Sequence, residues 1–427
     1  MEYKREIYVD RLNARKRNGL VKVITGLRRS GKSYLLNNLF HRSLVESGVD
    51  ERHIIKFAFD SAEDLEIIGE DLLDLERKNS KVDPRKFLEF VRDRLIDDGQ
   101  YYILLDEVQN LESFESVLNS YLRKDNLDIY ATGSNSKFLS SDILTEFEAR
   151  GDEVHVFPLS FSEFFSEYDG TKEEAYEEYS LYGGLPLVAN MRTEEQKAKY
   201  LESLIGKTYV RDIIRHNGLR SDTDMSDLLD VVSSAISSII SPRKLESAFK
   251  SMKGSQISRP TIERYTDFFA DSFLVSKAMR FDIKGKKYIS APFKLYFEDI
   301  GLRNAKLGFR QIEPTHVMEN IIYNELRFRG FDVDVGVVKS KQAASDSASV
   351  GGYEVDFVAN KGSKRYYIQS AYDIPNDEKW RQETMSLDRI GDSFEKIVVV
   401  RNPVVSRHSD KGYLLMNIFD FLLGKGL

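Results

Sequence analysis

The first 159 residues alternate between short apolar runs and stretches with apolar residues at helical spacing. In the stretches 33–44, 84–96 and 112–123, apolar residues recur three and four positions apart, which is typical of helices that pack one face. The apolar, β-prone runs between them are VKVIT (21–25), HIIKFAF (53–59), YYILL (101–105), LDIYAT (127–132) and VHVFP (154–158). Strands that alternate with helices predict an α/β domain over 1–159, with a parallel sheet covered on both faces.

The pattern changes twice after this segment. Helical spacing throughout 160–222 predicts a helical lid. Helix-like stretches from 241 and 258, followed by two β-like runs that meet at a lysine and glycine turn, predict a winged helix over 223–300. The segment 301–427 combines an amphipathic stretch with four β-like runs and a polar connection, which indicates a further α/β domain.

Composition narrows the kind of protein. The net charge is −7 and the pI is about 5.6, so the chain lacks the overall basic character of a dedicated DNA binder, although a local basic face remains compatible with it. The absence of cysteine excludes disulfides and thiolate metal sites. No apolar run approaches the roughly 20 residues that cross a bilayer, and the N-terminus is charged, so we expect a cytoplasmic protein without membrane contact.

The segment GLRRSGKS has the spacing of a phosphate-binding loop, and it lies between a predicted strand and a predicted helix. Its glycines allow the backbone N–H groups to converge on a phosphate, Lys32 reaches the β and γ oxygens, and the Ser33 hydroxyl binds Mg²⁺. We expect ATP to contact the loop and the start of the helix, through Gly26, Arg28, Arg29, Ser30, Gly31, Lys32, Ser33 and Tyr34.

Asp106 and Glu107 follow the apolar run YYILL, at a strand end where ligands bind in open α/β sheets. Asp106 is suited to hold Mg²⁺ and Glu107 to polarise the attacking water. The strand HIIKFAF falls between the loop strand and this acidic strand, which is typical of P-loop proteins that hydrolyse ATP by activating water. The alternative is that the acid pair caps the helix that follows it.

Polar residues after LDIYAT lead to the same edge of the sheet. Among Thr132 to Asn135, Ser134 could contact the γ-phosphate and Asn135 could orient the water, although an ordinary turn remains open. Arg150 could stabilise transition-state charge in a neighbouring active site, and the alternative is a solvated surface arginine.

Together, the motifs GLRRSGKS, LLDEVQN, TGSNSKFLS, PLSFSEF and YGGLP resemble those of prokaryotic predicted ATPases of the AAA+ superfamily whose C-terminal domain has no assigned function. FEDIGLRNAKLG, MENIIYNELRFRGF, EVDFVA and YYIQSAY extend the resemblance over nearly the whole chain. It implies ATP, Mg²⁺ and an unsettled biological role. Gly184-Leu185-Pro186 also resembles switch ATPases in which a glycine–proline turn closes a lid over the nucleotide, so Pro186 is a candidate contact. Glu148 and Ala149 depart from the family, which usually has glycine before the residue matching Arg150.

The C-terminal segment resembles the outline of the restriction-endonuclease fold. Glu319 lies on a helix, Asp356 on a strand, and the next strand carries Gln369 and Ala371 where active members have glutamate and lysine. A neutral amide is a poor Mg²⁺ ligand, and without the lysine nothing polarises the nucleophile, so we expect little or no nuclease activity. The alternative is that Glu354 and Asp356 form only the polar face of an edge strand.

The predicted winged helix carries both signs of charge. Arg259, Arg264, Lys284, Lys286 and Lys287 could meet phosphates. They are interrupted by Asp267, Asp271 and Asp282. DNA contact therefore stays open.

Two functional hypotheses follow. The first is Mg²⁺-dependent ATP hydrolysis that drives a conformational switch, with DNA or a protein as partner. The second is a nucleotide-gated DNA- or protein-binding module with negligible turnover. The oligomeric state stays open, because AAA-type relatives often form rings while the departure before Arg150 weakens its assignment.

Overall fold

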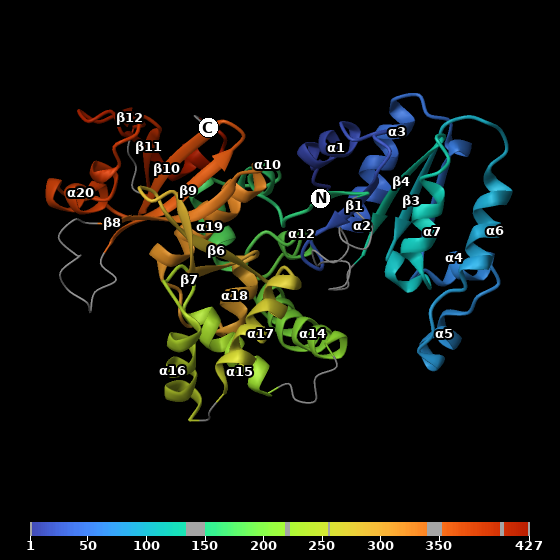
Figure 1. The fold of residues 1–427 in the computed structure, drawn as a ribbon, viewed down its shortest axis with the longest axis horizontal. Coiled ribbons are helices and arrows are strands. Elements are labelled where there is room, and N and C mark those ends of the chain that lie inside the picture. Colours follow the sequence, from blue (N-terminus) through green and yellow to red (C-terminus); the bar gives the residue numbers. More distant parts are fainter. Residues whose placement is uncertain are drawn as a thin grey trace. The chain divides into compact units, whose positions relative to one another are not determined.

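The computed structural model describes residues 2–133, 150–217, 223–254, 257–339, 352–401 and 405–425 (Figure 1). The chain divides into two compact units, Met1–Pro158 with Asp271–Phe273 and Leu159–Ala270 with Leu274–Leu427. The first boundary lies one residue from the predicted end of the first domain. Each unit is described by itself.

Unit 1 is built on five parallel strands in the order β2-β3-β4-β1-β5. The strands are β1 (Val21–Thr25), β2 (Ile54–Ala58), β3 (Tyr101–Asp106), β4 (Leu127–Thr132) and β5 (Gly151–His155). All residues of β1, β3 and β4 are buried, as expected for strands covered on both faces. The α/β class and the parallel sheet predicted from the sequence are confirmed.

One detail of the predicted arrangement is wrong. HIIKFAF precedes the acidic strand along the chain, but its strand β2 lies at the edge of the sheet and does not separate β1 from β3. The strand between them is β4, which pairs in parallel with both. The separation of the loop strand from the acidic strand therefore exists, and LDIYAT provides it.

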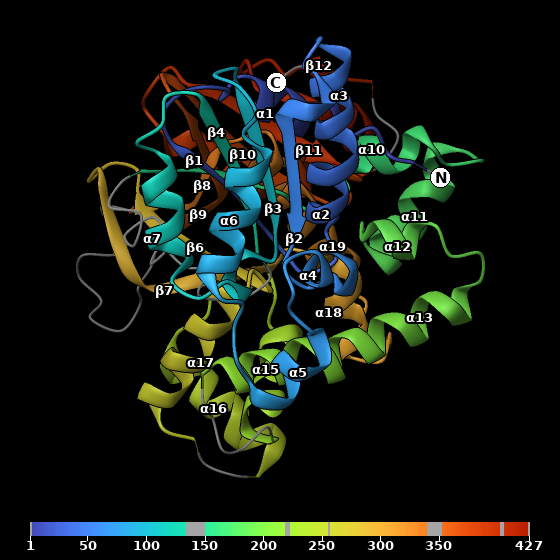
Figure 2. The same ribbon diagram turned by 90° about the vertical axis from the view of Figure 1, so that its right-hand side faces the viewer.

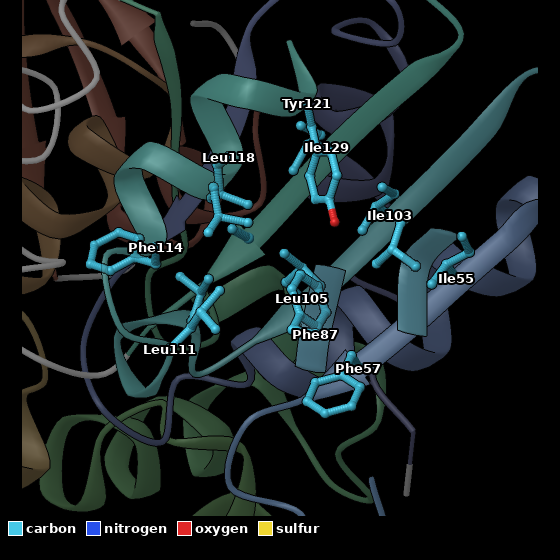
Figure 3. Packing of buried hydrophobic residues seen from close by; sticks show 14 of the residues in the cluster. Ile55, Phe57, Phe87, Ile103, Leu105, Leu111, Phe114, Leu118, Tyr121 and Ile129 are labelled. Atoms are coloured by element: carbon cyan, nitrogen blue, oxygen red, sulfur yellow. The ribbon is translucent and has the colours of Figure 1, made fainter. Parts of the chain in front are cut away.

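Helices cover both faces of the unit 1 sheet (Figure 1). On one face, α6 and α7 supply aromatic and aliphatic side chains that pack against β2, β3 and β4, including Phe87, Phe114 and Leu118 (Figure 3). The helix after the phosphate loop lies on the other face, where the Phe40 ring packs at a tilt against the Tyr130 ring. The helical segments are α1 (Glu6–Asn13), α2 (Lys32–Tyr34), η1 (Leu35–Phe40), α3 (His41–Glu46), η2 (Glu51–His53), α4 (Ala62–Ile67), α5 (Leu72–Lys78), α6 (Pro84–Arg94), η3 (Val108–Asn110) and α7 (Phe114–Tyr121).

Unit 2 contains an eight-stranded mixed sheet in the order β12-β13-β11-β10-β9-β8-β6-β7. The strands are β6 (Val275–Asp282), β7 (Lys287–Phe297), β8 (Asp332–Lys339), β9 (Gly352–Lys361), β10 (Lys364–Ala371), β11 (Glu395–Val400), β12 (Arg407–His408) and β13 (Leu414–Asn417). The helical segments are α10 (Phe161–Ser166), α11 (Lys172–Tyr182), α12 (Pro186–Ala189), α13 (Glu194–Ser203), η4 (Leu204–Tyr209), α14 (Val210–His216), α15 (Thr223–Ser234), α16 (Pro242–Lys253), α17 (Arg259–Asp271), α18 (Ile300–Lys306), α19 (Pro314–Phe328), α20 (Asp377–Thr384), η6 (Leu387–Arg389) and α21 (Ile418–Leu422).

The predicted β-wing belongs to this large sheet. β6 and β7 form an antiparallel hairpin, and β6 also pairs in parallel with β8. Ile240 bridges Phe293 on the outer side of β7, and α15, α16 and α17 lie together beside that strand (Figure 2). The sheet therefore runs across the predicted boundary at residue 300. The division of unit 2 into 160–222, 223–300 and 301–427 stays a prediction.

Two of the sequence motifs meet in unit 2. In YGGLP, the Gly184 N–H donates to Asp299 at 2.8 Å, and a Cβ on Gly183 would lie 2.4 Å from that carboxylate. A Cβ on Gly301, in FEDIGLRNAKLG, would lie 2.0 Å from the Tyr182 carbonyl oxygen. Burial raises the pKa of Asp299 to about 6. The glycines of both motifs thus allow the end of α11 and the start of α18 to approach each other closely.

Candidate nucleotide site and carboxylate cluster

The phosphate loop joins the buried end of β1 to α2. Gly26 has φ 132°, and a Cβ there would lie 2.2 Å from the Val156 carbonyl oxygen, so a larger residue does not fit. Gly31 (φ 97°) and Arg29 (φ 68°) are also left-handed. The Ser30 N–H donates to the Leu27 carbonyl at 3.1 Å. This tight curl is the backbone shape that a phosphate-binding loop requires.

Lys32 lies across the loop that precedes it. Its buried ammonium donates to the carbonyls of Gly26 at 2.9 Å and Leu27 at 3.1 Å. Arg29 is exposed, and the exposed Tyr34 donates its hydroxyl to Glu2 at 2.8 Å. The expected nucleotide contacts of these side chains, like that of the half-buried Arg28, stay predictions.

Ser33 and Asp106 come together at the carboxyl ends of the strands. The Ser33 hydroxyl donates to Asp106 Oδ1 at 3.1 Å, the Thr132 hydroxyl donates to the same oxygen, and Asn37 Nδ2 donates to Oδ2 at 3.2 Å. Burial raises the pKa of Asp106, while the Thr132 and Ser33 hydrogen bonds oppose that rise. Hydroxyl and carboxylate oxygens are the ligands that Mg²⁺ prefers, so the residues present fit this ion.

Glu107 is the next residue and has a left-handed backbone conformation with φ 50°, so the chain turns away from the direction of β3 at this residue. Gln109 Nε2 donates to its carboxylate. A further acid, Asp60, follows β2 at the same carboxyl ends of the strands. Partial burial, followed by the charges of Glu107 and Asp106, raises the pKa of Asp60. The edge therefore gathers three acidic residues, of which sequence reasoning identified two.

The sequence analysis did not identify Asp60 and Asn37, although the position of each in the sequence indicates that it lies near the site. Asp60 comes directly after the apolar run HIIKFAF, and parallel strands end at one edge. Asn37 lies four residues after Ser33, which places both on one helix face.

The remaining predicted site residues have different outcomes. Ser134 and Asn135 lie outside the described residues. Arg150 has an exposed side chain, and its carbonyl accepts from the Val21 N–H at 2.9 Å, at the end of the sheet opposite the loop. It is thus remote from the loop of its own sheet, and both readings of it stay open. Pro186 begins α12 in unit 2, and its nucleotide contact stays a prediction.

Unit 2 contains a cluster of one lysine and three carboxylates, in which Lys294, Glu319 and Asp356 are buried and Glu354 is half-buried. The ammonium of Lys294, on β7, lies 2.8 Å from Glu319 on α19, 2.7 Å from Glu354 and 3.6 Å from Asp356, both on β9. The Tyr296 hydroxyl donates to Glu319 at 2.7 Å. Burial opposes the lysine's charge, but Glu319, Asp356 and Glu354 raise its pKa, so Lys294 remains an ammonium.

Lys294 does not take the place of the lysine that active restriction endonucleases carry at the position of Ala371 on β10. Ala371 is buried at the predicted lysine position, and Gln369 accepts only long contacts from the Asp356 N–H and the Ser386 hydroxyl, both at 3.4 Å. An ammonium held charged by three acids cannot accept a proton from water. In the part of the chain that the structure describes, no group of three or more His, Cys, Asp or Glu side chains could hold a metal ion. The prediction of little or no nuclease activity stands untested.

Asp356 makes unit 2 sensitive to pH. Burial, followed by the charge of Glu319, raises its pKa from 3.8 to about 8. Between these values the folded protein holds a proton that the unfolded chain has lost, so this group's contribution to stability falls as pH rises from about 4 to about 8. Asp356→Asn should therefore flatten the pH dependence in this window. Urea unfolding of both proteins at pH 5 and pH 8 measures this, and an unchanged pH dependence in the variant would contradict it.

Some basic residues of the predicted winged helix form ion pairs, and others are exposed to solvent. Arg259 pairs with Glu246 at 2.6 Å, and Lys277 pairs with Asp267. Asp282 is buried and accepts from the Gly285 N–H at 2.9 Å, so it stabilises the hairpin turn. The side chains of Arg264, Lys284, Lys286 and Lys287 are exposed.

Comparison with protein families identifies two matches. Residues 18–165 match the model of an AAA domain, and residues 173–313 match a domain of unknown function, DUF8612. An uncharacterised protein from Haemophilus influenzae is 29% identical over 425 residues, 98% of both chains. Another from Methanocaldococcus jannaschii is 25% identical over 413 residues, which cover 89% of this chain and 84% of the relative. The AAA part of the resemblance is thus supported, and the nuclease-like part stays a prediction.

Similarities to solved structures are weaker. Cdc6p from Pyrobaculum aerophilum is 13% identical, with a TM-score of 0.29 and 74% of this chain and 93% of that chain covered. AMPPCP-bound DnaA from Aquifex aeolicus is 15% identical, with a TM-score of 0.30 and coverage of 64% and 89%. TM-scores this low carry no conclusion about this chain. Across the described residues, no helix has both the length and the apolar character to span a membrane.

Proposed function

We propose that the protein binds ATP with Mg²⁺ at the loop 26–33 and hydrolyses it to ADP and phosphate. The observation that carries this proposal is the 3.1 Å hydrogen bond from Ser33 to Asp106. It joins the loop to the acidic strand end, so the two halves of a magnesium–nucleotide site are already adjacent. The match of residues 18–165 to an AAA domain supports the same function.

Each residue of the site has a task in this reaction. The Lys32 ammonium, which now binds loop carbonyls, turns to the β- and γ-phosphate oxygens. Ser33 and Asp106 would hold Mg²⁺, which would neutralise charge on the phosphates. Glu107 accepts a proton from the attacking water, whose oxygen bonds to the γ-phosphorus as the bond to the β-phosphate oxygen breaks. Thr132 and Asn37 orient Asp106.

A Lys32→Ala variant tests the site as a whole. Without the ammonium, the phosphates lose their main side-chain charge partner, so we expect ATP affinity to fall by at least tenfold and phosphate release to fall to background. Phosphate release at saturating ATP, with and without single- and double-stranded DNA, measures turnover. Lys16→Ala, outside the loop, is the control. Equal phosphate release by wild type and Lys32→Ala under every condition would refute hydrolysis at this loop.

A second candidate function is a nucleotide-gated module with negligible turnover. It is favoured by the hydrogen bond from Gln109 to the Glu107 carboxylate, because an engaged carboxylate is a weaker base for water. In this case ATP binding would expose a surface for DNA or a protein. Tight ATP binding by wild type without phosphate release would support this function over hydrolysis.

We propose DNA as one partner. The support is the exposed Arg264 and the three exposed lysines at the hairpin turn, Lys284, Lys286 and Lys287. An oligomer is a further proposal, in which Arg150 would reach a neighbouring subunit. Stimulation of phosphate release by DNA in the assay above would support the first of these proposals.

A further inference from the structure

Arg5 links the phosphate loop to the chain that follows β5. The residue is 6% exposed, its Nη1 donates to the Ser30 carbonyl at 3.2 Å, and its Nη2 donates to the Phe157 carbonyl at 2.7 Å. The guanidinium lies 4.6 Å from the centre of the Tyr8 ring. The Tyr8 hydroxyl accepts from the Phe157 N–H at 3.0 Å. The start of the chain thus holds both backbone groups of Phe157 and one carbonyl of the loop.

The Phe157 end of this link is firmly fixed. The preceding Val156 N–H donates to the Thr25 carbonyl at 2.9 Å, which continues the pairing of β5 with β1. The Val156 carbonyl oxygen closely approaches Gly26. Arg5 therefore connects Ser30, in the phosphate loop, to the backbone of Phe157, which directly follows the residues that pair with β1.

The link to Ser30 controls the orientation of a peptide. In a trans peptide the carbonyl and the N–H point in opposite directions, so holding the Ser30 oxygen on the Arg5 side points the Gly31 N–H away from Arg5. A phosphate loop works by converging such N–H groups on the phosphate. Because glycine turns easily between backbone conformations, a hydrogen bond to this peptide from outside the loop helps to fix its orientation. The charged, two-pronged guanidinium provides a strong one.

The backbone of Arg5 is itself constrained. Arg5 has φ 50° and ψ 35°, a left-handed conformation that is unfavourable for a residue with a side chain. Its contacts with Ser30 and Phe157 accompany this conformation. Strain that the surrounding contacts hold in place at a candidate site is consistent with a positioning role.

We propose that Arg5 is a positioning residue of the nucleotide site, which presets the Gly31 N–H for the β-phosphate. The proposal rests on the proposed function. It also extends the site beyond residues 18–165, because Arg5 precedes that segment. A β-phosphate is present in both ATP and ADP, so Arg5 should matter for both nucleotides alike.

The test compares the Arg5→Met, Arg5→Lys and Arg11→Met variants in the full chain. Arg11 also lies over the Tyr8 ring, at 5.3 Å, so Arg11→Met is the matched control. Affinity for a fluorescent ATP and a fluorescent ADP is measured with Mg²⁺, and circular dichroism checks folding. We expect Arg5→Met to weaken both affinities by about 10- to 100-fold. Arg5→Lys keeps the charge but loses the two-pronged guanidinium, so it should fall between wild type and Arg5→Met, while Arg11→Met should bind like wild type.

The outcomes separate the proposal from its premise. If wild type binds neither nucleotide, the proposed function fails. If wild type binds and either folded Arg5 variant binds equally well, only the positioning role is overturned. Tyr8→Phe provides a second measurement, because it removes the acceptor for the Phe157 N–H and leaves the Ser30 contact. It should retain affinity, and a loss as large as that of Arg5→Lys would show that general packing, not the hold on Ser30, controls binding.

Discussion

Glu107→Gln is expected to lower ATP turnover by a factor of about 100 or more while nucleotide binding is retained. The amide keeps the size of the side chain but cannot accept a proton from water. Lys32, Ser33 and Asp106 are unchanged, so ATP should bind and remain unhydrolysed. Rapid-quench measurement of one turnover, together with the affinity for ATP, tests both parts of this result.

Two further variants make the outcome decisive. Glu112→Gln removes an exposed carboxylate five residues away and should turn over like wild type. Asp60→Asn tests the other acid at this edge of the sheet. If Asp60→Asn abolishes hydrolysis and Glu107→Gln does not, the roles of the two residues are exchanged. If wild type binds ATP but has no turnover that Glu107→Gln could reduce, the nucleotide-gated module is the better description.

Lys294→Met is expected to destabilise unit 2 by about 3–5 kcal/mol. Methionine keeps most of the apolar stem but removes the ammonium that contacts Glu319, Glu354 and Asp356. The buried Glu319 and Asp356 and the half-buried Glu354 would then lie together without a cation. Urea unfolding followed by tryptophan fluorescence measures the effect, because Trp380 is the single tryptophan of the chain and packs against the core of unit 2.

The matched control is Lys287→Met, on the same strand but exposed, which should change stability by less than about 0.5 kcal/mol. Adding Glu319→Gln to Lys294→Met removes one of the repelling charges and should recover part of the loss. A Lys294→Met protein as stable as wild type would show that the cluster tolerates the loss of its cation.

The features predicted well from the sequence depend on neighbouring residues. GLRRSGKS needs a strand before it and a helix after it, and both are visible within about 20 residues. β3 is recognisable because a run of fully buried residues in a sheet covered on both faces is apolar throughout. Ser33 and Asp106 could be paired because parallel strands end at one edge, even though they are distant along the chain.

The features that were missed depend on which distant segments pair. Nothing within HIIKFAF shows whether β2 lies at the edge or in the middle of the sheet, since both positions bury apolar residues. The hairpin β6–β7 was recognised, but its pairing with β8 was not, because that contact joins segments separated by α18 and α19. The sequence analysis did not single out Lys294, because its partners lie on α19 and β9.

The pairing of β6 with β8 also decides where the protein can be divided for biochemical work. A fragment that ends at residue 300 would lose the β8 partner of Arg280, Phe281 and Asp282 on β6. Exposed strand edges promote aggregation. It would also remove Glu319, Glu354 and Asp356, the three acids that Lys294 contacts. DNA-binding studies of the hairpin turn should therefore keep β6, β7, α19, β8 and β9 in one piece.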